Sequence, residues 1–442
     1  MRSLMKNSAE NLTAEPSRSD VKSAEIICVG SELLLGDILN GNAQYVAQQL
    51  ASLGIAHHYQ TVVGDNPTRI KRAVAIACER ARLIIFTGGL GPTPDDLTVE
   101  TLADFFGANL SERPEIVVDL EEKFARRGRP LSVESRKQAQ LPQGANILPN
   151  PVGTAPGVLW QPRAGLVVMT FPGVPSEMKA MWQATAVPYL RQNGWARGGI
   201  HSQTLKFWGM GETTLARTVK SFLSADNPTV ATYALGGEVK LRVSAKAASG
   251  EAANALIRPV ADVIIQLTGA ACYGKDSDTM ADVVGQLLRG QGQTLGVAES
   301  CTGGGLGQLL TAVPGSSDYF WGGVISYDNR VKEGLLGVDA AVLATKGAVS
   351  AEVAAMMADG VRTRLRADWG MSITGIAGPG GGTAEKPVGL VYIGLASAKE
   401  IATERFTFGE QLSREQIRVR SAVSALNLLR IKLLSKESGK TI

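Results

Sequence analysis

The chain has 442 residues, 44% of them hydrophobic, which is enough for about three domains of roughly 150 residues, each with its own core. Its 45 basic and 41 acidic side chains nearly cancel, and a net charge of +4 argues against nucleic acid as a direct ligand. The four cysteines include no CxxC pair, so neither a disulfide framework nor a cysteine zinc site is indicated. The three histidines are His57, His58 and His201, so any chemistry beyond residue 201 runs without an imidazole.

The N-terminal segment and the lengths of the apolar runs favour a cytoplasmic protein. The first 22 residues are polar and lack the apolar core of a secretory signal, so we expect a disordered tail over residues 1–23. No apolar run approaches the roughly 18 residues that a membrane-spanning helix needs. We therefore expect no membrane partner.

From residue 24 to residue 175, short apolar runs alternate with helical periodicity, which is typical of βα units around a mostly parallel sheet. Asn66 and Pro67 are a typical N-cap and first residue of a helix. The pattern predicts strands at 24–30, 55–63, 82–89 and 165–173, and helices near 42–53, from Pro67 onward and around 115–126.

Two further domains follow along the chain. Residues 176–272 show a smaller α+β alternation, and residues 273–442 return to an α/β pattern. The middle segment predicts helices at 176–192, 212–223 and 251–267 and strands at TLKFWG and VKLRVSAKA. The last segment predicts a helix near 278, strands at 294–300, 322–328 and 389–397, a strand with a glycine loop at 371–382, a helix at 351–365 and a long helix from 413.

Strand ends of the first domain carry glycines together with acidic residues. The residues are Gly88, Gly89, Gly91, Asp95, Asp96 and Glu32, and a third strand end, FPGVPSEM, adds Glu177. Ligands bind at such strand ends in open α/β sheets, where glycine N–H groups cradle a phosphate and paired carboxylates hold a divalent cation. The pattern predicts a metal-assisted phosphate-ester or pyrophosphate site. The alternative is a tight turn in which an aspartate caps the next helix.

The third domain has a glycine-rich turn, VAESCTGGGLG, between a buried strand and a helix. Ser300 and Thr302 lie in this turn beside a helix N-terminus, which favours anions. The N–H groups around Gly303 and Gly304 either hold a substrate phosphate or form an oxyanion hole for a nucleophilic Ser300. Cys301 is a rival nucleophile, but a catalytic cysteine usually needs a histidine and this domain has none.

Without an imidazole, a nucleophilic serine has to be activated by lysine or tyrosine. The segment SYDNRVK supplies Tyr327 at a strand end and Lys332 in the first turn of the next helix. A desolvated lysine accepts a proton, whereas the alternative is a surface lysine beside a half-buried tyrosine. Thr374 lies in a second glycine loop. Arg414 and Arg418 lie four residues apart at the start of the last helix. They either contact a substrate phosphate or form a solvated face of the helix.

These motifs closely resemble the CinA family of competence/damage-inducible proteins over residues 24–434. The first domain resembles it in GSELLLGDILNGNAQ, VGDNP, TGGLGPTPDDLT, RKQAQLP, NPVGTAPG and FPGVPSEM, and the third in AESCTGG, SYDNRVK, GAVS, SITGIAGPGGG and KPVG. The resemblance implies an α/β protein with a molybdopterin-binding-like α/β sandwich at 24–175, a small KH-like α+β domain at 176–272 and a C-terminal α/β amidase domain at 273–442.

For the activity, the resemblance implies a bifunctional hydrolase of pyridine-nucleotide salvage that forms a homodimer. The third domain would deamidate nicotinamide mononucleotide to nicotinate mononucleotide and ammonia, without a cofactor. The first domain would hydrolyse ADP-ribose with a divalent metal of unspecified identity. The amidase motif carries over onto Ser300, Thr302, Tyr327, Lys332, Thr374 and Arg414.

Two other functions stay open at this point. A nucleotide- or pterin-binding scaffold for competence or DNA damage would use the same glycines in catalytically silent pockets. Molybdopterin adenylyl transfer follows from the resemblance of the first domain alone. Intact Ser300, Tyr327 and Lys332 argue against a catalytically silent third domain. No comparable set of residues argues against a silent first domain, because the same glycines serve to bind or to cleave a pyrophosphate.

Overall fold

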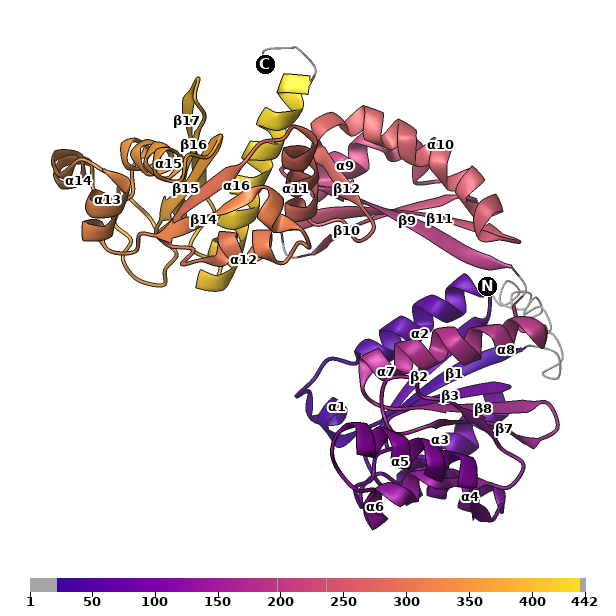
Figure 1. Ribbon diagram of the computed structural model, residues 1–442. Coiled ribbons are helices and arrows are strands. Elements are labelled where there is room, and N and C mark those ends of the chain that lie inside the picture. The colour runs from indigo at the N-terminus through magenta and orange to yellow at the C-terminus, as the bar shows by residue number, and fades with distance from the viewer. Residues whose placement is uncertain (1–21, 197, 236, 438–442) are drawn as a thin grey trace, which may run out of the picture. The chain divides into compact units, whose positions relative to one another are not determined.

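The computed structural model describes residues 22–196, 198–235 and 237–437 (Figure 1). The disordered tail expected at residues 1–23 lies outside these ranges except for its last two residues, of which Ser23 begins the first strand. Within the described ranges, no helix combines the length and the apolar character needed to cross a membrane.

The first compact unit, residues 22–201 with 245–255, contains a six-stranded sheet in the order β2-β1-β3-β8-β7-β6. Its strands are β1 (Ser23–Val29), β2 (Ala56–Val63), β3 (Leu83–Thr87), β6 (Asn146–Leu148), β7 (Gly157–Arg163) and β8 (Leu166–Phe171). Strands β2, β1, β3 and β8 run parallel, and β7 and β6 pair antiparallel. The four parallel strands are those predicted from the sequence, which indicated neither β6 nor β7.

Helices cover both faces of this sheet, so alternate strand residues enter two separate cores. The helices are α1 (Ser31–Leu35), α2 (Gly41–Ser52), α3 (Pro67–Arg80), α4 (Thr98–Phe106), α5 (Pro114–Arg126), α6 (Val133–Arg136), α7 (Pro175–Met181) and α8 (Val187–Gln192), and β4 (Leu110–Glu112) pairs with β5 (Gln140–Pro142). Ile26 packs with α2, α7 and α8, whereas its neighbour Ile27 packs with α3, α4 and α5. Burial on both faces explains why these strands are continuous apolar runs.

Side-chain caps set the beginnings of two of these helices. The Asn40 side chain accepts the N–H of Ala43 at 3.1 Å and begins α2. Asn66 accepts the N–H of Arg69 at 3.1 Å, and Pro67 is the first residue of α3. The predicted start of α3 is therefore confirmed.

The segment 176–192 differs from its predicted place in the middle domain. Met178, Met181 and Trp182 are fully buried in the core of the first sheet, and the Trp182 ring lies 5.6 Å from that of Phe171 on β8. The apolar side chains of α7 and α8 thus have their partners on the first sheet. A helical period by itself does not reveal which sheet a helix covers.

The middle domain has a four-stranded sheet in the order β10-β11-β9-β12. Its elements are β9 (Gly199–Phe207), α9 (Glu212–Thr218), β10 (Thr229–Leu235), β11 (Glu238–Ala247), α10 (Gly250–Thr268) and β12 (Cys272–Lys275). Along β11, buried Leu241 and Val243 alternate with the exposed Arg242 and Lys246. This alternation is typical of an antiparallel sheet that is covered on one face.

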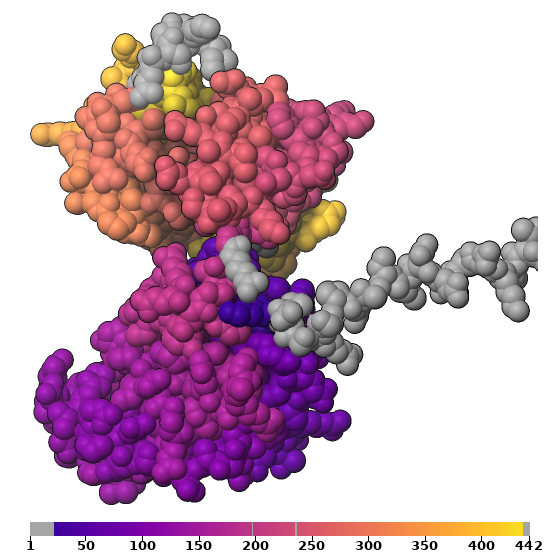
Figure 2. Space-filling model, turned by 90° about the vertical axis from the view of Figure 1, so that its right-hand side faces the viewer, coloured from indigo at the N-terminus to yellow at the C-terminus, as the bar shows by residue number. Residues whose placement is uncertain are grey.

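The third domain has a five-stranded sheet in the order β14-β13-β15-β16-β17, with β14, β13 and β15 parallel and the other two antiparallel. Its strands are β13 (Leu295–Glu299), β14 (Phe320–Ile325), β15 (Trp369–Gly375), β16 (Leu390–Ala396) and β17 (Ile401–Thr407), and its helices are α11 (Met280–Gly290), α12 (Gly305–Thr311), α13 (Asn329–Leu336), α14 (Ala340–Lys346), α15 (Ala351–Leu365) and α16 (Arg414–Glu437). One face packs against α11, α12 and α16, and the other against α13, α14 and α15. Residues 202–244 and 256–437 form the second compact unit, which contains the orange and yellow segments of Figure 2.

Candidate functional sites

Predicted catalytic residues of the third domain gather at the carboxyl ends of its three parallel strands. Ser300 directly follows β13, Tyr327 follows β14, and Thr374 is the next-to-last residue of β15. Parallel strands end at the same edge of a sheet, where ligand sites form. From the first turn of α13, Lys332 Nζ reaches Ser300 Oγ at 3.3 Å. The structure therefore brings this serine and lysine within hydrogen-bond reach.

The amine of Lys332 is buried and hydrogen-bonded to backbone carbonyl groups. The residue is 1% exposed, and its Nζ lies 2.6 Å from the carbonyl oxygen of Ser326 and 3.3 Å from that of Tyr327. No carboxylate of the described residues lies within 4.0 Å of the amine. Burial lowers the pKa of Lys332, and the charge of Asp328 opposes this in part. The amine is placed as a hydrogen-bond donor to Ser300 Oγ and to both carbonyls; in its neutral form it would have two N–H groups for the carbonyls and a lone pair left for the serine hydroxyl.

The glycine turn after Ser300 uses its N–H groups internally. The N–H of Gly303 donates to the Ser300 carbonyl at 3.1 Å, and that of Gly304 donates to the Glu299 carboxylate at 3.0 Å. Both glycines have a positive φ, 58° and 97°, which side chains other than glycine rarely adopt. The expectation that Gly303 and Gly304 hold a phosphate is therefore corrected, because neither N–H is free in this turn.

Within the described part of the chain, the hydroxyl of Thr302 is unpaired, in contrast to the N–H groups of Gly303 and Gly304. Its side chain is 1% exposed, and its hydroxyl has no hydrogen-bond partner among the described residues. Buried polar groups are nearly always paired, so an unpaired hydroxyl two residues after Ser300 is a candidate hydrogen-bond donor for a bound molecule.

Among the described residues, the Tyr327 phenol is hydrogen-bonded to Arg414 and not to Lys332. The tyrosine side chain is 62% exposed, and its phenol oxygen accepts a hydrogen bond from Arg414 Nη2 at 3.1 Å. Arg414 also donates to the Gly378 carbonyl at 2.7 Å. Thr374 is buried, and its hydroxyl donates to the Ala348 carbonyl at 2.7 Å. The contact between Tyr327 and Lys332 is thus made by the backbone carbonyl rather than by the phenol.

Arg418 and Cys301 complete the surroundings of the turn. Arg418 donates to the Thr302 carbonyl at 2.7 Å, which makes it a second guanidinium at this site. Cys301 is 6% exposed, and burial raises the pKa of its thiol to about 11. Because the thiolate is the reactive form, this environment favours Ser300 over Cys301 as nucleophile.

The first domain has a cavity of about 540 Å³ at the carboxyl ends of β1, β3 and β8. A cavity of this size is typical of small-molecule sites. It is lined by the predicted residues Glu32, Gly88, Gly89, Gly91, Asp95, Asp96 and Glu177, and also by Asn42, Asp65 and Gln138. The predicted residues of this domain are therefore brought together.

The glycines of this cavity have separate structural duties. A Cβ on Gly88 would lie 2.1 Å from the Val29 carbonyl oxygen, and the φ of Gly88 is +100°. Its N–H donates to the Phe171 carbonyl at 2.9 Å, so Gly88 packs two strand ends and has no N–H for a phosphate. The N–H groups of Gly89 and Gly91 have no acceptor within the described part of the chain. These two can hold an anion.

Asp95 and Asp96 differ in how they are used. Asp96 Oδ2 accepts the N–H of Thr93 at 2.9 Å and also its hydroxyl, so it caps the turn. Asp95 is exposed, and a hydrogen bond from Thr93 lowers the pKa of its carboxyl group. Among the described residues, no group of three or more His, Cys, Asp or Glu side chains is arranged to hold a metal ion. Asp95 and Asp96 therefore do not form a complete metal site with other side chains of the described residues.

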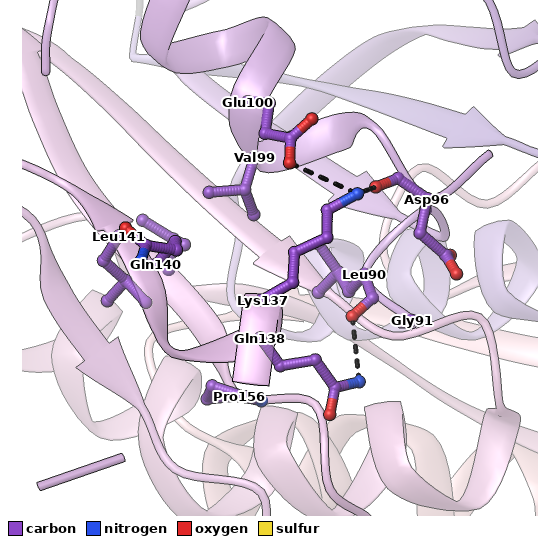
Figure 3. A pocket seen from close by; sticks show the side chains of 12 residues that line it. Leu90, Gly91, Asp96, Val99, Glu100, Lys137, Gln138, Gln140, Leu141 and Pro156 are labelled. Atoms are coloured by element: carbon purple, nitrogen blue, oxygen red, sulfur yellow. Dashed lines mark hydrogen bonds and ion pairs between the residues drawn. The ribbon is translucent and has the colours of Figure 1, made fainter. Parts of the chain in front are cut away.

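Lys137 fixes the segment that carries the two aspartates, as Figure 3 shows. Its Nζ donates to the Asp96 carbonyl at 2.7 Å and lies 3.2 Å from a Glu100 carboxylate oxygen. Beside it, Gln138 donates to the Leu90 carbonyl at 3.3 Å and leaves its own oxygen without a partner among the described residues. Sequence reasoning assigned no role to either residue, although both lie in the segment RKQAQLP.

Asp65 and Glu299 are further residues to which the sequence analysis gave no role. Asp65 accepts the N–H and the hydroxyl of Ser31 at 2.9 and 2.8 Å, which fixes the turn before Glu32. Glu299 precedes Ser300 and is 2% exposed. Their motifs, VGDNP and AESCTGG, mark the right strand ends but not the partners of these carboxylates.

Three family models match consecutive parts of the chain. Residues 25–192 match the probable molybdopterin binding domain, residues 202–274 the damage-inducible protein CinA KH domain, and residues 277–433 the CinA C-terminal domain. Together they cover most of the described chain. They agree with the expected order of three domains.

Several proteins are similar to this chain over nearly their whole length. A CinA-like protein of Cyanothece sp. is 63% identical over 94% of this chain and 99% of its own, and one of Trichormus variabilis is 62% identical over 94% and 100%. Among solved structures, the competence/damage inducible protein CihA from Agrobacterium tumefaciens is 38% identical, with a TM-score of 0.34, over 35% of this chain and 93% of its own.

Proposed function

The chain belongs to the family of CinA-like proteins, and on this premise we propose that its third domain is an amidase that converts nicotinamide mononucleotide to nicotinate mononucleotide and ammonia. The observation that carries the proposal is the buried amine of Lys332, 3.3 Å from Ser300 Oγ, in a domain without histidine. A serine and a desolvated lysine are the parts that acyl transfer needs when imidazole is absent.

In the first half of the reaction, Lys332 acts as general base. Its neutral amine takes the proton of Ser300 as Oγ attacks the carboxamide carbon. The resulting oxyanion accepts a hydrogen bond from the unpaired hydroxyl of Thr302. The protonated amine then passes its proton to the amide nitrogen, the C–N bond breaks, and ammonia leaves an ester on Ser300.

In the second half, water takes the place of ammonia. Lys332 removes a proton from water as the oxygen attacks the ester carbon, and it returns the proton to Ser300 Oγ as the ester C–O bond breaks. The product is the carboxylic acid, which ionises in solution. No metal or organic cofactor is used in these steps, and Lys332 ends each cycle as the neutral amine.

The substrate phosphate is held by Arg414 and Arg418 in this proposal. Arg414 donates a hydrogen bond to the Tyr327 phenol, and Arg418 donates one to the Thr302 carbonyl. The two arginines are four residues apart in the first turns of α16. Arginine pairs with phosphate through several N–H groups. The exposed ring of Tyr327 lies beside them and offers a stacking face for the pyridine ring.

Ammonia and nicotinate mononucleotide are measured with the wild type and with Ser300→Ala and Lys332→Ala. We expect steady turnover by the wild type and a loss of at least a hundredfold in each variant, because each removes a covalent or proton-transfer step. Absence of wild-type turnover, or full activity in both variants, refutes the proposal.

A second proposal concerns the first domain, where water cleaves the pyrophosphate of ADP-ribose. It is favoured by the cavity of about 540 Å³, whose lining includes Asp95 together with Gly89 and Gly91, two glycines whose N–H groups have no acceptor among the described residues. The glycine N–H groups would hold phosphate oxygens, and the carboxylates of Asp95 and Asp96 would hold the metal.

The described residues fit a divalent cation that enters with the substrate. Asp96 commits one oxygen to Thr93, so the pair supplies few ligands, as is usual for Mg²⁺ held between carboxylates and phosphates. When bound, such a cation neutralises charge on the pyrophosphate and polarises the P–O bond. Asp95 and Asp96 would hold it.

The first-domain proposal is tested with ADP-ribose, Mg²⁺ or Mn²⁺, and the variants Asp95→Asn and Asp96→Asn. We expect release of AMP that is lost with Asp95→Asn.

Two measurements distinguish the alternative functions. Calorimetry on the same sample identifies a binding-only scaffold, which takes up ADP-ribose without turnover. ATP-dependent product formation with molybdopterin identifies adenylyl transfer. Light scattering tests the homodimer that belongs to the same proposal.

A further inference from the structure

A buried carboxylate directly before Ser300 has no part in the reaction steps above. Glu299 is the last residue of β13 and is 2% exposed. Its two carboxylate oxygens accept three backbone N–H groups, from Gly304 at 3.0 Å, Leu306 at 3.0 Å and Gly307 at 2.8 Å. These donors belong to the glycine turn and to the first turn of α12. Glu299 thus occupies the place where a bound anion would meet this helix.

The backbone of Glu299 is joined to the base as well. Its carbonyl oxygen accepts the N–H of Ser326 at 2.7 Å, and the Ser326 carbonyl in turn accepts the amine of Lys332 at 2.6 Å. On the other side, the N–H of Ser300 donates to the Ile373 carbonyl at 2.9 Å. The turn that carries the nucleophile is therefore tied at its start by the sheet and at its end by the Glu299 carboxylate.

We propose that Glu299 is a positioning residue with two effects at the amidase site: its carboxylate holds the glycine turn so that Ser300 faces Lys332, and its charge keeps anions from the start of α12. This inference rests on the proposed amidase function. Three hydrogen bonds to one ionised group fix a turn firmly, because bonds to a charged acceptor are the stronger ones. An isolated helix N-terminus attracts anions, and an internal carboxylate cancels that attraction.

The charge has a consequence for substrate and product. The substrate presents a neutral carboxamide to Ser300, whereas the product presents a carboxylate. The N–H groups of residues 303–307 all have acceptors within the turn or on the Glu299 carboxylate, so this segment offers the product carboxylate no free N–H group, and the neutral amide is bound in preference to the acid. The phosphate, also an anion, is left to the two arginines of α16.

The variants Glu299→Gln and Glu299→Asp test both effects, with Glu404→Gln on the exposed part of β17 as the matched control. Gln replaces one acceptor oxygen by a donor and removes the charge, whereas Asp keeps the charge on a shorter side chain. Circular dichroism and thermal unfolding set an assay temperature at which all four proteins are folded. If Glu299→Gln does not fold, Glu299→Asp still tests the effect of a displaced carboxylate on the nucleophile.

The first readout is covalent labelling of Ser300 by a fluorophosphonate, followed by mass spectrometry. We expect the labelling rate and kcat to fall at least tenfold in Glu299→Gln, less in Glu299→Asp and not at all in Glu404→Gln, while KM changes less than threefold. Labelling of Glu299→Gln at the wild-type rate overturns the positioning role. A wild type that is neither labelled nor active refutes the amidase proposal itself, and this inference with it.

The second readout is inhibition by nicotinate mononucleotide. We expect the ratio of its inhibition constant to KM to fall at least fivefold in Glu299→Gln and to stay at the wild-type value in Glu299→Asp. A purely structural role would change both variants alike. An unchanged ratio in an active Glu299→Gln overturns the role in selecting the neutral amide.

Discussion

Replacing Lys332 by methionine separates the chemistry of the amine from its packing. Methionine keeps an unbranched, flexible side chain in a position that is 1% exposed. In the proposed mechanism the lost amine is the general base, a contribution of about 10²- to 10⁴-fold in rate. That range corresponds to about 2.7–5.4 kcal/mol of activation free energy. We therefore expect Lys332→Met to be folded and to have lost at least a hundredfold in kcat.

The same substitution changes how stability depends on pH. Burial lowers the pKa of Lys332 in the folded protein, so the unfolded chain binds this proton more strongly. Below the folded pKa the cost of the buried ammonium is fully present, and it disappears as pH rises toward the unfolded value of about 10.4. The wild type therefore gains stability relative to Lys332→Met across this interval, by about 1.4 kcal/mol for each unit by which the pKa is lowered.

Urea unfolding of both proteins between neutral and alkaline pH measures this difference. Other ionisable groups cancel, because they are present in both chains. In parallel, kcat/KM of the wild type is expected to rise with pH and to level off above the folded pKa of Lys332, since the neutral amine is the base. A pH-independent difference in unfolding free energy, or a variant within threefold of wild-type kcat, refutes the reasoning.

Three other changes test separate features. Gly88→Ala is expected to lower the unfolding free energy by about 1–3 kcal/mol more than Gly107→Ala, since both have positive φ but only Gly88 meets a carbonyl oxygen; equal losses in urea unfolding contradict this. Arg418→Met is expected to lower kcat/KM for nicotinamide mononucleotide at least tenfold and for the riboside less than twofold, and parallel losses argue against a phosphate contact. Cys301, buried with a raised pKa, is expected to resist iodoacetamide in the native protein; rapid modification seen by mass spectrometry would contradict its packing.

Much of the fold was readable from local patterns. The strand–helix alternation predicted the parallel strands of the first domain, and Asn66 with Pro67 predicted the start of α3. Short edge strands such as β6 carry too few residues for a pattern, and so they were missed. The segment 176–192 was recognised as helical, but its sheet was not, because amphipathic period is a local property and packing partner is not.

The sequence by itself determined the chemistry available to this protein. A histidine-free third domain with Ser300 in a glycine turn, Tyr327 at a strand end and Lys332 in the next helix already favoured serine chemistry assisted by lysine or tyrosine over chemistry that needs a histidine. The tertiary structure decided how each group is used. In the folded protein the N–H of Gly304 donates to the Glu299 carboxylate, and the phenol of Tyr327 accepts a hydrogen bond from Arg414. The physical reason is that a polar group in a buried turn must find a partner, and which partner is nearest depends on how distant segments pack.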